Sequence, residues 1–421
     1  MKKLFASIIT IGDELLIGQV IDTNSAFIAQ ELNKIGVPVK HRLAVGDGYD
    51  DIWNALDEES KHAAIILITG GLGPTADDIT KPLLCKYFGG NMILDEPTLE
   101  HVKYLFEKVF NRQGPLLERN RKQAEVPDVA TVLKNEVGTA PGLLFEKNGT
   151  IFIAMPGVPF EMKWITTNHV IPIIKEKFET GFIEHRTLLT QGIGESILAE
   201  LLQDWEEEIP AHIKLAYLPN HGMVRLRLTG NSFDKEALNN ELDNQFAQVK
   251  ILVKDYLITD EDIPMEQVVA KLLKAKKQTL ATAESCTGGH IASLFTQHAG
   301  ASNFFTGTVV CYDNRIKTEL LGVPREILTT VGAVSEETVK LMAANIIKLM
   351  GTDYSIAVSG IMGPGGATDE KPVGQVWIAV ANKQSVIAKQ FNFRYDRTRN
   401  IHFTAINAIN LLRKLILEQP I

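Results

Sequence analysis

The sequence predicts an α/β protein of three domains, and three observations support that fold class. Apolar runs of strand length alternate with helical patterns over residues 1–170, which is typical of a mainly parallel sheet covered by helices on both faces. The same alternation returns after residue 265. A chain of 421 residues also exceeds the usual length of one domain. We expect an α/β domain at 1–170, a small α+β domain at 171–258 and a second α/β domain at 259–421.

The first domain is predicted to begin with a buried strand, because the apolar run Leu4–Ile11 leads directly into acidic residues. Asp22 or Thr23 can cap the next helix by accepting a hydrogen bond from a backbone N–H of its first turn. The dipeptide Asn148-Gly149 between two apolar runs predicts a hairpin. The other elements expected here are strands over 39–45, 63–69, 143–145 and 150–155, and helices over 23–35, 49–59 and 160–177, the last disturbed at Pro172.

The second domain is predicted as a small α+β unit of about 75 residues, a size that can form its own core. Its expected elements are a strand over 187–191, a helix over 196–207, a hairpin of 213–217 with 224–228, and a helix over 235–249. The acidic segment TDEDIP at 259–264 is the predicted linker. Strands and helices then alternate to Leu417, including a strand that ends at Tyr312 and a helix that begins near Asp313.

The composition excludes several classes of protein. A net charge of −8 argues against general nucleic-acid binding, which needs a basic surface. No apolar run approaches the roughly 20 residues of a membrane-spanning helix, and the N-terminal run has no cleavage site of a signal peptide. Cys85, Cys286 and Cys311 are too scattered for a disulfide framework or a zinc site. We expect a reduced, cytoplasmic protein without membrane or nucleic-acid partners.

A glycine-rich turn follows the third strand of the first domain. Its sequence, TGGLGPT at 69–75, brings backbone N–H groups close to an anion, and the next helix start adds a favourable dipole. Asp77 and Asp78 follow, and a divalent cation would bridge them to a phosphate. The segments GDE at 12–14 and MPG at 155–157 follow other strands, where open α/β sheets bind ligands. We expect a phosphate site, with ordinary turns and helix caps as the alternative, although no P-loop motif is present.

The segment AESCTGG at 283–289 forms the second candidate site. An apolar strand stops there and a helical pattern follows, which places Ser285 at a strand-to-helix corner where backbone N–H groups are expected to be unpaired. A hydroxyl in such a corner can attack a carbonyl carbon while N–H groups stabilise the oxyanion. Cys286 is a rival nucleophile because its thiolate is intrinsically stronger. A serine at this position also serves commonly as a helix cap, so the residue alone leaves the alternatives open.

Three further segments offer partners for this serine. Lys317 lies in a helix after the strand that ends at Tyr312, and a desolvated lysine has a lowered pKa and can act as a general base. It would take the proton from Ser285 directly or through Tyr312. The glycine turn at 358–366 could donate backbone N–H groups. The arginines that could pair with a substrate phosphate are Arg394, Arg397 and Arg399.

Together these motifs resemble the competence/damage-inducible CinA family over nearly the whole chain. The segments GDELLIGQVIDTN, TGGLGPT with its acidic residues, GTAPG and MPGVPFEM are similar to the N-terminal domain of that family. That domain resembles molybdopterin-binding proteins and is associated with metal-dependent pyrophosphatase activity on ADP-ribose. The segments AESCTGG, YDNRIK, SGIMGP and the one that contains Arg399 are similar to a nicotinamide-nucleotide amidase domain. The middle domain resembles a KH-type fold.

The resemblance implies a role for each matching residue. The implied catalytic residues are Ser285 as nucleophile, Lys317 as base and Tyr312 as its partner. Ser359, where many relatives carry threonine, and Gly360 match the turn that binds the reacting amide. Arg399 matches the arginine that anchors the substrate. In the first domain the implied substrate-binding residues are Gly70, Gly71, Gly73 and Thr75, and the implied metal ligands are Asp13, Asp77 and Asp78, for a divalent cation of unspecified identity.

The resemblance implies a bifunctional enzyme of pyridine-nucleotide recycling. The C-terminal domain would hydrolyse nicotinamide mononucleotide to nicotinic acid mononucleotide and ammonia without a cofactor, and the N-terminal domain would cleave the diphosphate of ADP-ribose. A homodimer is expected. RNA binding is not, because the nearest GxxG-like sequence, Gly192-Ile-Gly194-Glu195, lacks basic surroundings. The alternative is a nucleotide- or pterin-binding accessory protein of competence or DNA-damage response that performs no catalysis.

Overall fold

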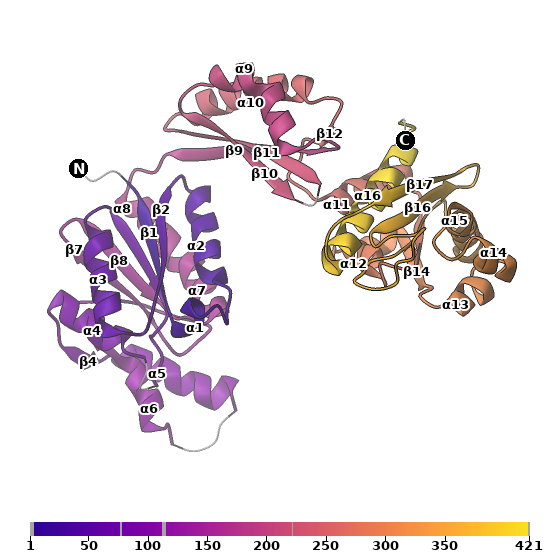
Figure 1. Ribbon diagram of the computed structural model, residues 1–421. Helices are drawn as coiled ribbons and strands as arrows, with labels where there is room; N and C mark the ends of the chain where they lie inside the picture. The colour runs from indigo at the N-terminus through magenta and orange to yellow at the C-terminus, as the bar shows by residue number, and fades with distance from the viewer. Residues whose placement is uncertain (1–3, 76–77, 112–114, 221, 420–421) are drawn as a thin grey trace. The chain divides into compact units, whose positions relative to one another are not determined.

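The computed structural model describes residues 4–75, 78–111, 115–220 and 222–419 (Figure 1). The chain divides into two compact units, Met1–His185 with Thr229–Leu242, and Arg186–Leu228 with Asp243–Ile421. Mixed α/β structure runs through both, as the sequence predicts. No helix within the described ranges is long and apolar enough to cross a membrane.

The first unit contains a six-stranded sheet in the order β2-β1-β3-β8-β7-β6. The strands are β1 (Ala6–Ile11), β2 (Val39–Val45), β3 (Ile65–Thr69), β6 (Thr131–Leu133), β7 (Gly142–Lys147) and β8 (Thr150–Met155). The four strands β2, β1, β3 and β8 are parallel, whereas β7 and β6 extend the sheet in antiparallel fashion. The predicted hairpin is confirmed, and both of its turn residues, Asn148 and Gly149, have positive φ.

Helices cover both faces of this sheet, as its apolar strands require. The helices are α1 (Asp13–Leu16), α2 (Thr23–Lys34), α3 (Tyr49–Ser60), α4 (Thr80–Phe88), α5 (Glu96–Tyr104), α6 (Glu118–Arg121), α7 (Pro159–Ile165) and α8 (Ile171–Lys177). One core packs α3 and α4 against the sheet, and the other packs α2, α7 and α8. Asp22 caps α2 as expected, since its carboxylate accepts a hydrogen bond from the Ser25 N–H at 2.9 Å. The disturbance expected at Pro172 is a π-helical segment over Thr166–Val170, just before the proline.

The small α+β region forms a four-stranded sheet in the order β10-β11-β9-β12, with residues in both units. Its strands are β9 (Phe182–Gln191), β10 (Ile213–Asn220), β11 (Met223–Ser232) and β12 (Leu257–Thr259), and its helices are α9 (Glu195–Glu207) and α10 (Lys235–Leu252). The pattern predicted the first three strands and both helices. It missed β12, whose three half-buried residues give too short a signal. A further short pair, β4 (Met92–Leu94) and β5 (Glu125–Pro127), lies in the first unit.

The rest of the second unit is built on a five-stranded sheet in the order β14-β13-β15-β16-β17. The strands are β13 (Leu280–Glu284), β14 (Phe305–Val310), β15 (Tyr354–Gly360), β16 (Gln375–Asn382) and β17 (Val386–Asn392), and the helices are α11 (Met265–Lys276), α12 (His290–Thr296), α13 (Asn314–Glu319), α14 (Arg325–Thr330), α15 (Glu336–Met350) and α16 (Arg397–Ile416). One face packs against α11, α12 and α16, and the other against α15. Strand β13 is central, with a parallel neighbour on each side.

Candidate active site

The carboxyl ends of β14, β13 and β15 lie side by side at one edge of the sheet. Glu284 pairs with Val310 on one side and with Val358 on the other. The next backbone hydrogen bonds continue this register: the Ser285 N–H donates to the Val358 carbonyl at 3.1 Å, and the Cys311 N–H donates to the Glu284 carbonyl at 2.9 Å. Neighbouring strands are about 4.8 Å apart, so the residues that follow these three strands are close together.

Alternation along the strands places the candidate side chains on the face covered by α15. Ala283 and Ala357 belong to the apolar cluster that contains the α15 residues. Two residues further along each strand come Ser285 and Ser359, which share that face by the period of two. Ser285 is 8% exposed. Its hydroxyl makes no hydrogen bond to the part of the chain that the structure describes, so it is available to a ligand.

Glu284, which the sequence analysis did not single out, organises the turn after β13. Its carboxylate is fully buried and accepts hydrogen bonds from the N–H groups of Gly289, Ile291 and Ala292 at 2.8–3.0 Å and from the Thr287 hydroxyl at 2.7 Å. The expectation of unpaired N–H groups at this helix start is therefore wrong for these three. The signal available in the sequence was an acidic residue five to eight positions before the N–H groups of a helix start.

Two backbone donors of the turn are left for a ligand. The N–H groups of Gly288 and His290 donate to carbonyls within the turn, at 3.3 and 3.1 Å. Among the described residues, those of Cys286 and Thr287 have no hydrogen-bond acceptor. These two donors directly follow Ser285 in the chain, which is where an oxyanion hole that uses the residue after the nucleophile takes its donors.

Lys317 is a buried lysine at the strand end next to Ser285. It lies in α13, is 1% exposed, and its Nζ donates to the carbonyls of Cys311 at 2.7 Å and Tyr312 at 3.3 Å. Burial lowers the pKa of its ammonium group, and the nearby Cys311 and Cys286 thiols oppose that shift. No hydrogen bond between Nζ and the Ser285 hydroxyl is present among the described contacts. The sequence thus predicted the neighbourhood of the two groups but not the carbonyl partners of the amine.

Tyr312 contributes to this edge differently from the expected proton relay. Its side chain is 61% exposed, and its hydroxyl accepts a hydrogen bond from Arg397 Nη2 at 3.0 Å, while only its backbone carbonyl contacts Lys317. Arg397 also donates to the Gly363 carbonyl at 2.8 Å. The Tyr312 hydroxyl therefore links the end of β14 to the start of α16 rather than Lys317 to Ser285.

The other expected residues of this domain lie on the neighbouring segments. Ser359 is 1% exposed and directly precedes Gly360 at the end of β15. Gly360 cannot carry a side chain, because a Cβ there would lie 2.7 Å from Val376 Cγ2. Arg399 lies in the exposed first turn of α16, with its Cζ 4.4 Å from the centre of the Tyr395 ring.

Cys286 does not have the environment of a nucleophile. Its thiol is buried in the apolar core on the side of α11, α12 and α16. Burial raises the pKa of the Cys286 thiol well above its usual range, and likewise raises the pKa of Cys311 to about 11. Because the thiolate is the reactive form, burial disfavours either thiol as the nucleophile. Ser285 is the better candidate of the two alternatives.

In the first unit, the three predicted ligand-binding segments converge at the ends of β1, β3 and β8. Gly70 has φ +118°, and a Cβ there would lie 2.3 Å from the Ile11 carbonyl oxygen. A Cβ on Gly157 would lie 3.4 Å from the Cα of Gly70. Asn24 donates to the Gly157 carbonyl at 2.8 Å, and its own side-chain carbonyl is buried without a partner. A small pocket of about 150 Å³ opens beside these residues.

The glycine turn itself folds tightly against the start of α4. Gly71 has φ +65°, and a Cβ there would lie only 2.0 Å from Thr80 Oγ1, a buried oxygen that has no hydrogen-bond partner within the described ranges. Asp78 holds the turn closed: its carboxylate accepts hydrogen bonds from the Thr75 N–H at 2.9 Å and from the Thr75 hydroxyl. A Cβ on Gly73 would lie 2.3 Å from the same carboxylate. Gly73 and Thr75 thus pack against Asp78, whereas Gly71 packs against the first residue of α4.

The expected metal ligands do not form a group among the described residues. Asp13 and Asp47 each accept a hydrogen bond from the backbone N–H of the other, at 3.3 and 3.1 Å. Asp78 is occupied with Thr75, and Asp77 lies outside the described residues. Within the described ranges, no set of three or more histidine, cysteine, aspartate or glutamate side chains could hold a metal ion. Asp13 and Asp78 alone therefore do not complete the expected set, which stays a prediction.

Lys81 is a buried group that sequence reasoning missed. It is 5% exposed, and its Nζ donates to the carbonyls of Lys122 at 3.2 Å and Gln123 at 3.3 Å. Burial lowers the pKa of Lys81 to about 8, although the charges of Glu125 and Asp78 oppose the shift. The available signal was helical spacing, since Lys81 precedes the buried Leu84 by three positions on α4.

Comparison with known proteins connects all three regions to described families. The family described as "CinA C-terminal domain" matches residues 262–416, "Probable molybdopterin binding domain" matches 7–176, and "Damage-inducible protein CinA KH domain" matches 185–259. The predicted combination of a molybdopterin-binding-like domain, a KH-type domain and a CinA C-terminal domain is therefore confirmed.

Relatives of similar length match almost end to end. A "CinA-like protein" of Cytophaga hutchinsonii is 45% identical over 415 residues, which cover 99% of each chain. A "Putative competence-damage inducible protein" of Caldicellulosiruptor bescii is 39% identical over 417 residues, covering 99% of this chain and all of that protein. A solved CinA superfamily protein of Klebsiella pneumoniae is 31% identical, covers 37% of this chain and 99% of its own, and has a TM-score of 0.36. The chain belongs to the CinA family.

Proposed function

We propose that the chain hydrolyses the carboxamide of nicotinamide mononucleotide at the edge formed by β14, β13 and β15, releasing nicotinic acid mononucleotide and ammonia. The observation that carries the proposal is a serine hydroxyl with no hydrogen-bond partner among the described residues, beside a buried lysine at the next strand end. Serine needs an adjacent base to become a nucleophile, and an amine with a lowered pKa can be that base at moderate pH.

The contacts of Lys317 suit the neutral form of its amine. A neutral amine has two N–H bonds and one lone pair, and Nζ already has two carbonyl acceptors. The lone pair is then free to take a proton. Because desolvation lowers the pKa of this group, the neutral form is more populated than for an exposed lysine.

The reaction follows from these groups in two steps. The Ser285 oxygen bonds to the carboxamide carbon as Lys317 takes its proton, and the N–H groups of Cys286 and Thr287 stabilise the oxyanion. The carbon–nitrogen bond then breaks, and Lys317 returns the proton to the leaving nitrogen, which departs as ammonia. In the second step a water attacks the acyl carbon as Lys317 takes its proton. The bond between that carbon and the Ser285 oxygen then breaks, Lys317 returns the proton to this oxygen, and the acid is released.

Arg399 is the proposed anchor for the nucleotide. It is exposed, and its guanidinium lies over the Tyr395 ring without an ion-pair partner among the described residues. A planar guanidinium can bind a phosphate through two parallel hydrogen bonds. The phosphate contact would act on substrate affinity rather than on the chemical steps.

Ammonia release from nicotinamide mononucleotide by the purified full chain tests the proposal. Ser285→Ala and Lys317→Met are each expected to lower kcat/KM by at least about 10²–10⁴-fold. Cys286→Ser is the matched control for the neighbouring thiol and is expected to retain activity within a few-fold. Near-wild-type turnover in Ser285→Ala, or loss of activity in Cys286→Ser with an intact fold, would overturn the assignment.

A second proposed function belongs to the first unit: binding and cleavage of the diphosphate of ADP-ribose, dependent on an added divalent cation. The buried and unpartnered oxygens of Asn24 and Thr80 beside the glycine turn favour a ligand there. The described carboxylates alone do not complete a cation site.

Incubation of the full chain with ADP-ribose, with a divalent cation or with a chelator, tests this second function. We expect release of AMP only with the cation, and a loss in Gly71→Ala, whose Cβ would displace Thr80. Cleavage in excess chelator would contradict the metal dependence. ADP-ribose binding without cleavage under every metal condition would instead support the accessory, non-catalytic alternative.

A further inference from the structure

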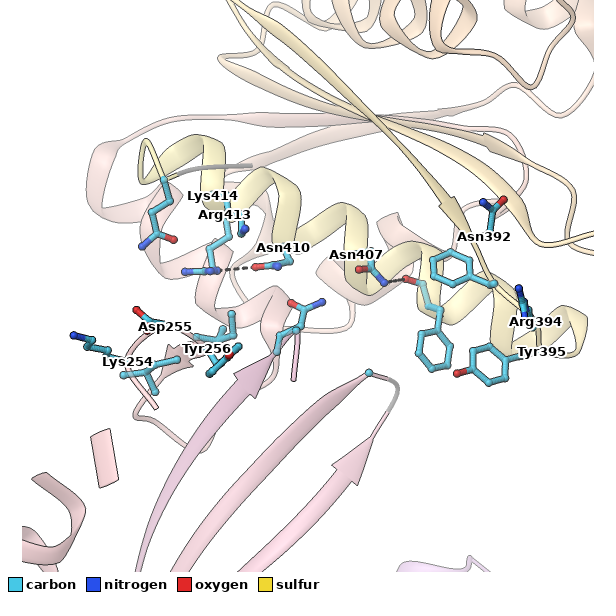
Figure 2. Close-up of a pocket in the computed structure, with 18 residues that line it drawn as sticks. Lys254, Asp255, Tyr256, Asn392, Arg394, Tyr395, Asn407, Asn410, Arg413 and Lys414 are labelled. Carbon is cyan, nitrogen blue, oxygen red and sulfur yellow. Dashed lines mark hydrogen bonds between the residues drawn. The ribbon is translucent and has the colours of Figure 1, made fainter. Parts of the chain in front are cut away.

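A large cavity lies in the second unit along one side of α16. Its volume is about 960 Å³. Figure 2 shows α16, with Asn407, Asn410 and Arg413, on one side of it and the segment that carries Lys254, Asp255 and Tyr256 on the other. None of the residues proposed for amide hydrolysis is among the described residues that line it.

The wall of this cavity contains a buried guanidinium. Arg413 is only 5% exposed, and its Nε donates to Asn410 Oδ1 at 2.9 Å (Figure 2). Its two Nη atoms make no hydrogen bond or ion pair with any residue that the structure describes. Burial lowers the pKa of the guanidinium. Both Nη atoms are available to an acceptor, so this wall is suited to a negatively charged group.

Other basic residues line the same cavity. They are Lys254, Arg394 and Lys414, whereas Asp255 is the acidic residue among the described lining. Burial lowers the pKa of Lys414, and the positive charges of Lys389 and Arg413 lower it further. Like charges held this close are relieved by a bound anion, and phosphate is an anion that guanidinium and ammonium groups bind well.

The rest of the lining suits the other parts of a nucleotide. Tyr256, Phe393, Tyr395 and Phe403 provide aromatic surface, and Tyr395 and Phe403 are stacked with their ring centres 4.5 Å apart. Gln191 contributes a buried side-chain oxygen without a partner. The volume also falls in the range of about 300–1,000 Å³ that is usual for small-molecule sites.

We propose that this cavity binds a phosphorylated small molecule of nucleotide size, with its phosphates at Arg413 and Lys414 and its ring on the aromatic surface. Arg413 and Arg399 lie on the same helix, 14 residues apart, which corresponds to about 21 Å along the axis. The proposed phosphate position at Arg413 is therefore distinct from the one at Arg399. Tyr395 connects the two, because it lines the cavity and stacks with Arg399.

Calorimetric titration of the full chain with ATP tests the proposal, with adenosine as the uncharged counterpart. Because the glycine turn of the first unit is itself a proposed phosphate site, the readout is the number of ATP sites as well as their affinity. The wild type is expected to bind ATP at this cavity with a Kd below about 1 mM. Arg413→Met and Lys254→Met should weaken that one site at least about tenfold. Because Lys254 is exposed, its substitution should leave the packing of the core unchanged.

The matched control is Arg325→Met, which removes an exposed charge on α14 outside the cavity. It should bind ATP as the wild type does. Adenosine that binds as tightly as ATP would contradict the role of the phosphates. Absence of an ATP site that responds to both Arg413→Met and Lys254→Met would overturn the proposal, whatever the outcome of the amide-hydrolysis assay.

Discussion

Lys81 in the first unit and Lys317 in the second have nearly the same surroundings. Each is almost fully buried, each donates from Nζ to the carbonyls of two consecutive residues, and burial lowers the pKa of each. The difference lies beside them. Next to Lys317 a free serine hydroxyl follows the adjacent strand, whereas the charges near Lys81 are the carboxylates of Glu125 and Asp78. A buried lysine becomes a base only where an acidic proton is within reach, so burial alone does not identify a catalytic residue.

The largest expected effect separates the two lysines by activity. Lys317→Met should lower ammonia release from nicotinamide mononucleotide by at least about 10²–10⁴-fold, while Lys81→Met should leave it within a few-fold. In the wild type the rate should rise with pH through the pKa of Lys317, which lies below 10.5, because only the neutral amine accepts a proton. The pH profile of kcat/KM for both variants measures this. If Lys317→Met kept the profile of the wild type, Lys317 would not be the base.

The next effect concerns the contribution of Lys81 to the free energy of unfolding. The pKa of Lys81 is about 8 in the folded chain, below the ordinary 10.5. The unfolded chain therefore binds more protons between these values, and the free energy of unfolding should rise with pH across that window. Lys81→Met should raise stability at pH 7 by at most about 3 kcal/mol and flatten the rise. Urea unfolding of the first unit at several pH values measures it, and a rise of equal slope in the variant would contradict the assignment.

A smaller effect compares the stability loss from an alanine in the glycine turn at 69–75 with the loss from an alanine in the turn after β13. Gly71→Ala places a Cβ 2.0 Å from Thr80 Oγ1 at positive φ and should cost about 1–3 kcal/mol. Gly288→Ala also has positive φ but would meet no atom within 4 Å, so only its backbone cost of about 1 kcal/mol remains. Thermal unfolding of both variants compares them. If both variants lost the same stability, the close contact between the Gly71→Ala Cβ and Thr80 would make no contribution to the loss.

The smallest effect concerns the exposed link at Tyr312. Tyr312→Phe removes the acceptor of the Arg397 hydrogen bond, and an exposed bond of this kind contributes about 0.5–1.5 kcal/mol. Turnover should fall less than about tenfold, since the hydroxyl is not on the path between Lys317 and Ser285. A loss as large as that of Lys317→Met would restore the tyrosine to a role in proton transfer.

The sequence predicted most of the fold and the neighbourhoods of both sites, because strand length, helical period and turn residues are local signals. It placed Ser285 and Lys317 after two strands, and parallel pairing brought those strand ends together. It could not predict Glu284 as the acceptor at the start of α12, since that role depends on burial and on the direction of a side chain. Lys81 and Arg413 were missed for the same reason, because the sequence alone does not distinguish a buried basic residue from an exposed one.

The Glu284 carboxylate gives the start of α12 a negative charge where a helix would ordinarily attract anions. A neutral carboxamide can approach that corner without repulsion. Under the proposed reaction, Glu284 would restrict oxyanion binding to the two N–H groups that directly follow Ser285, because its carboxylate already occupies those of Gly289, Ile291 and Ala292.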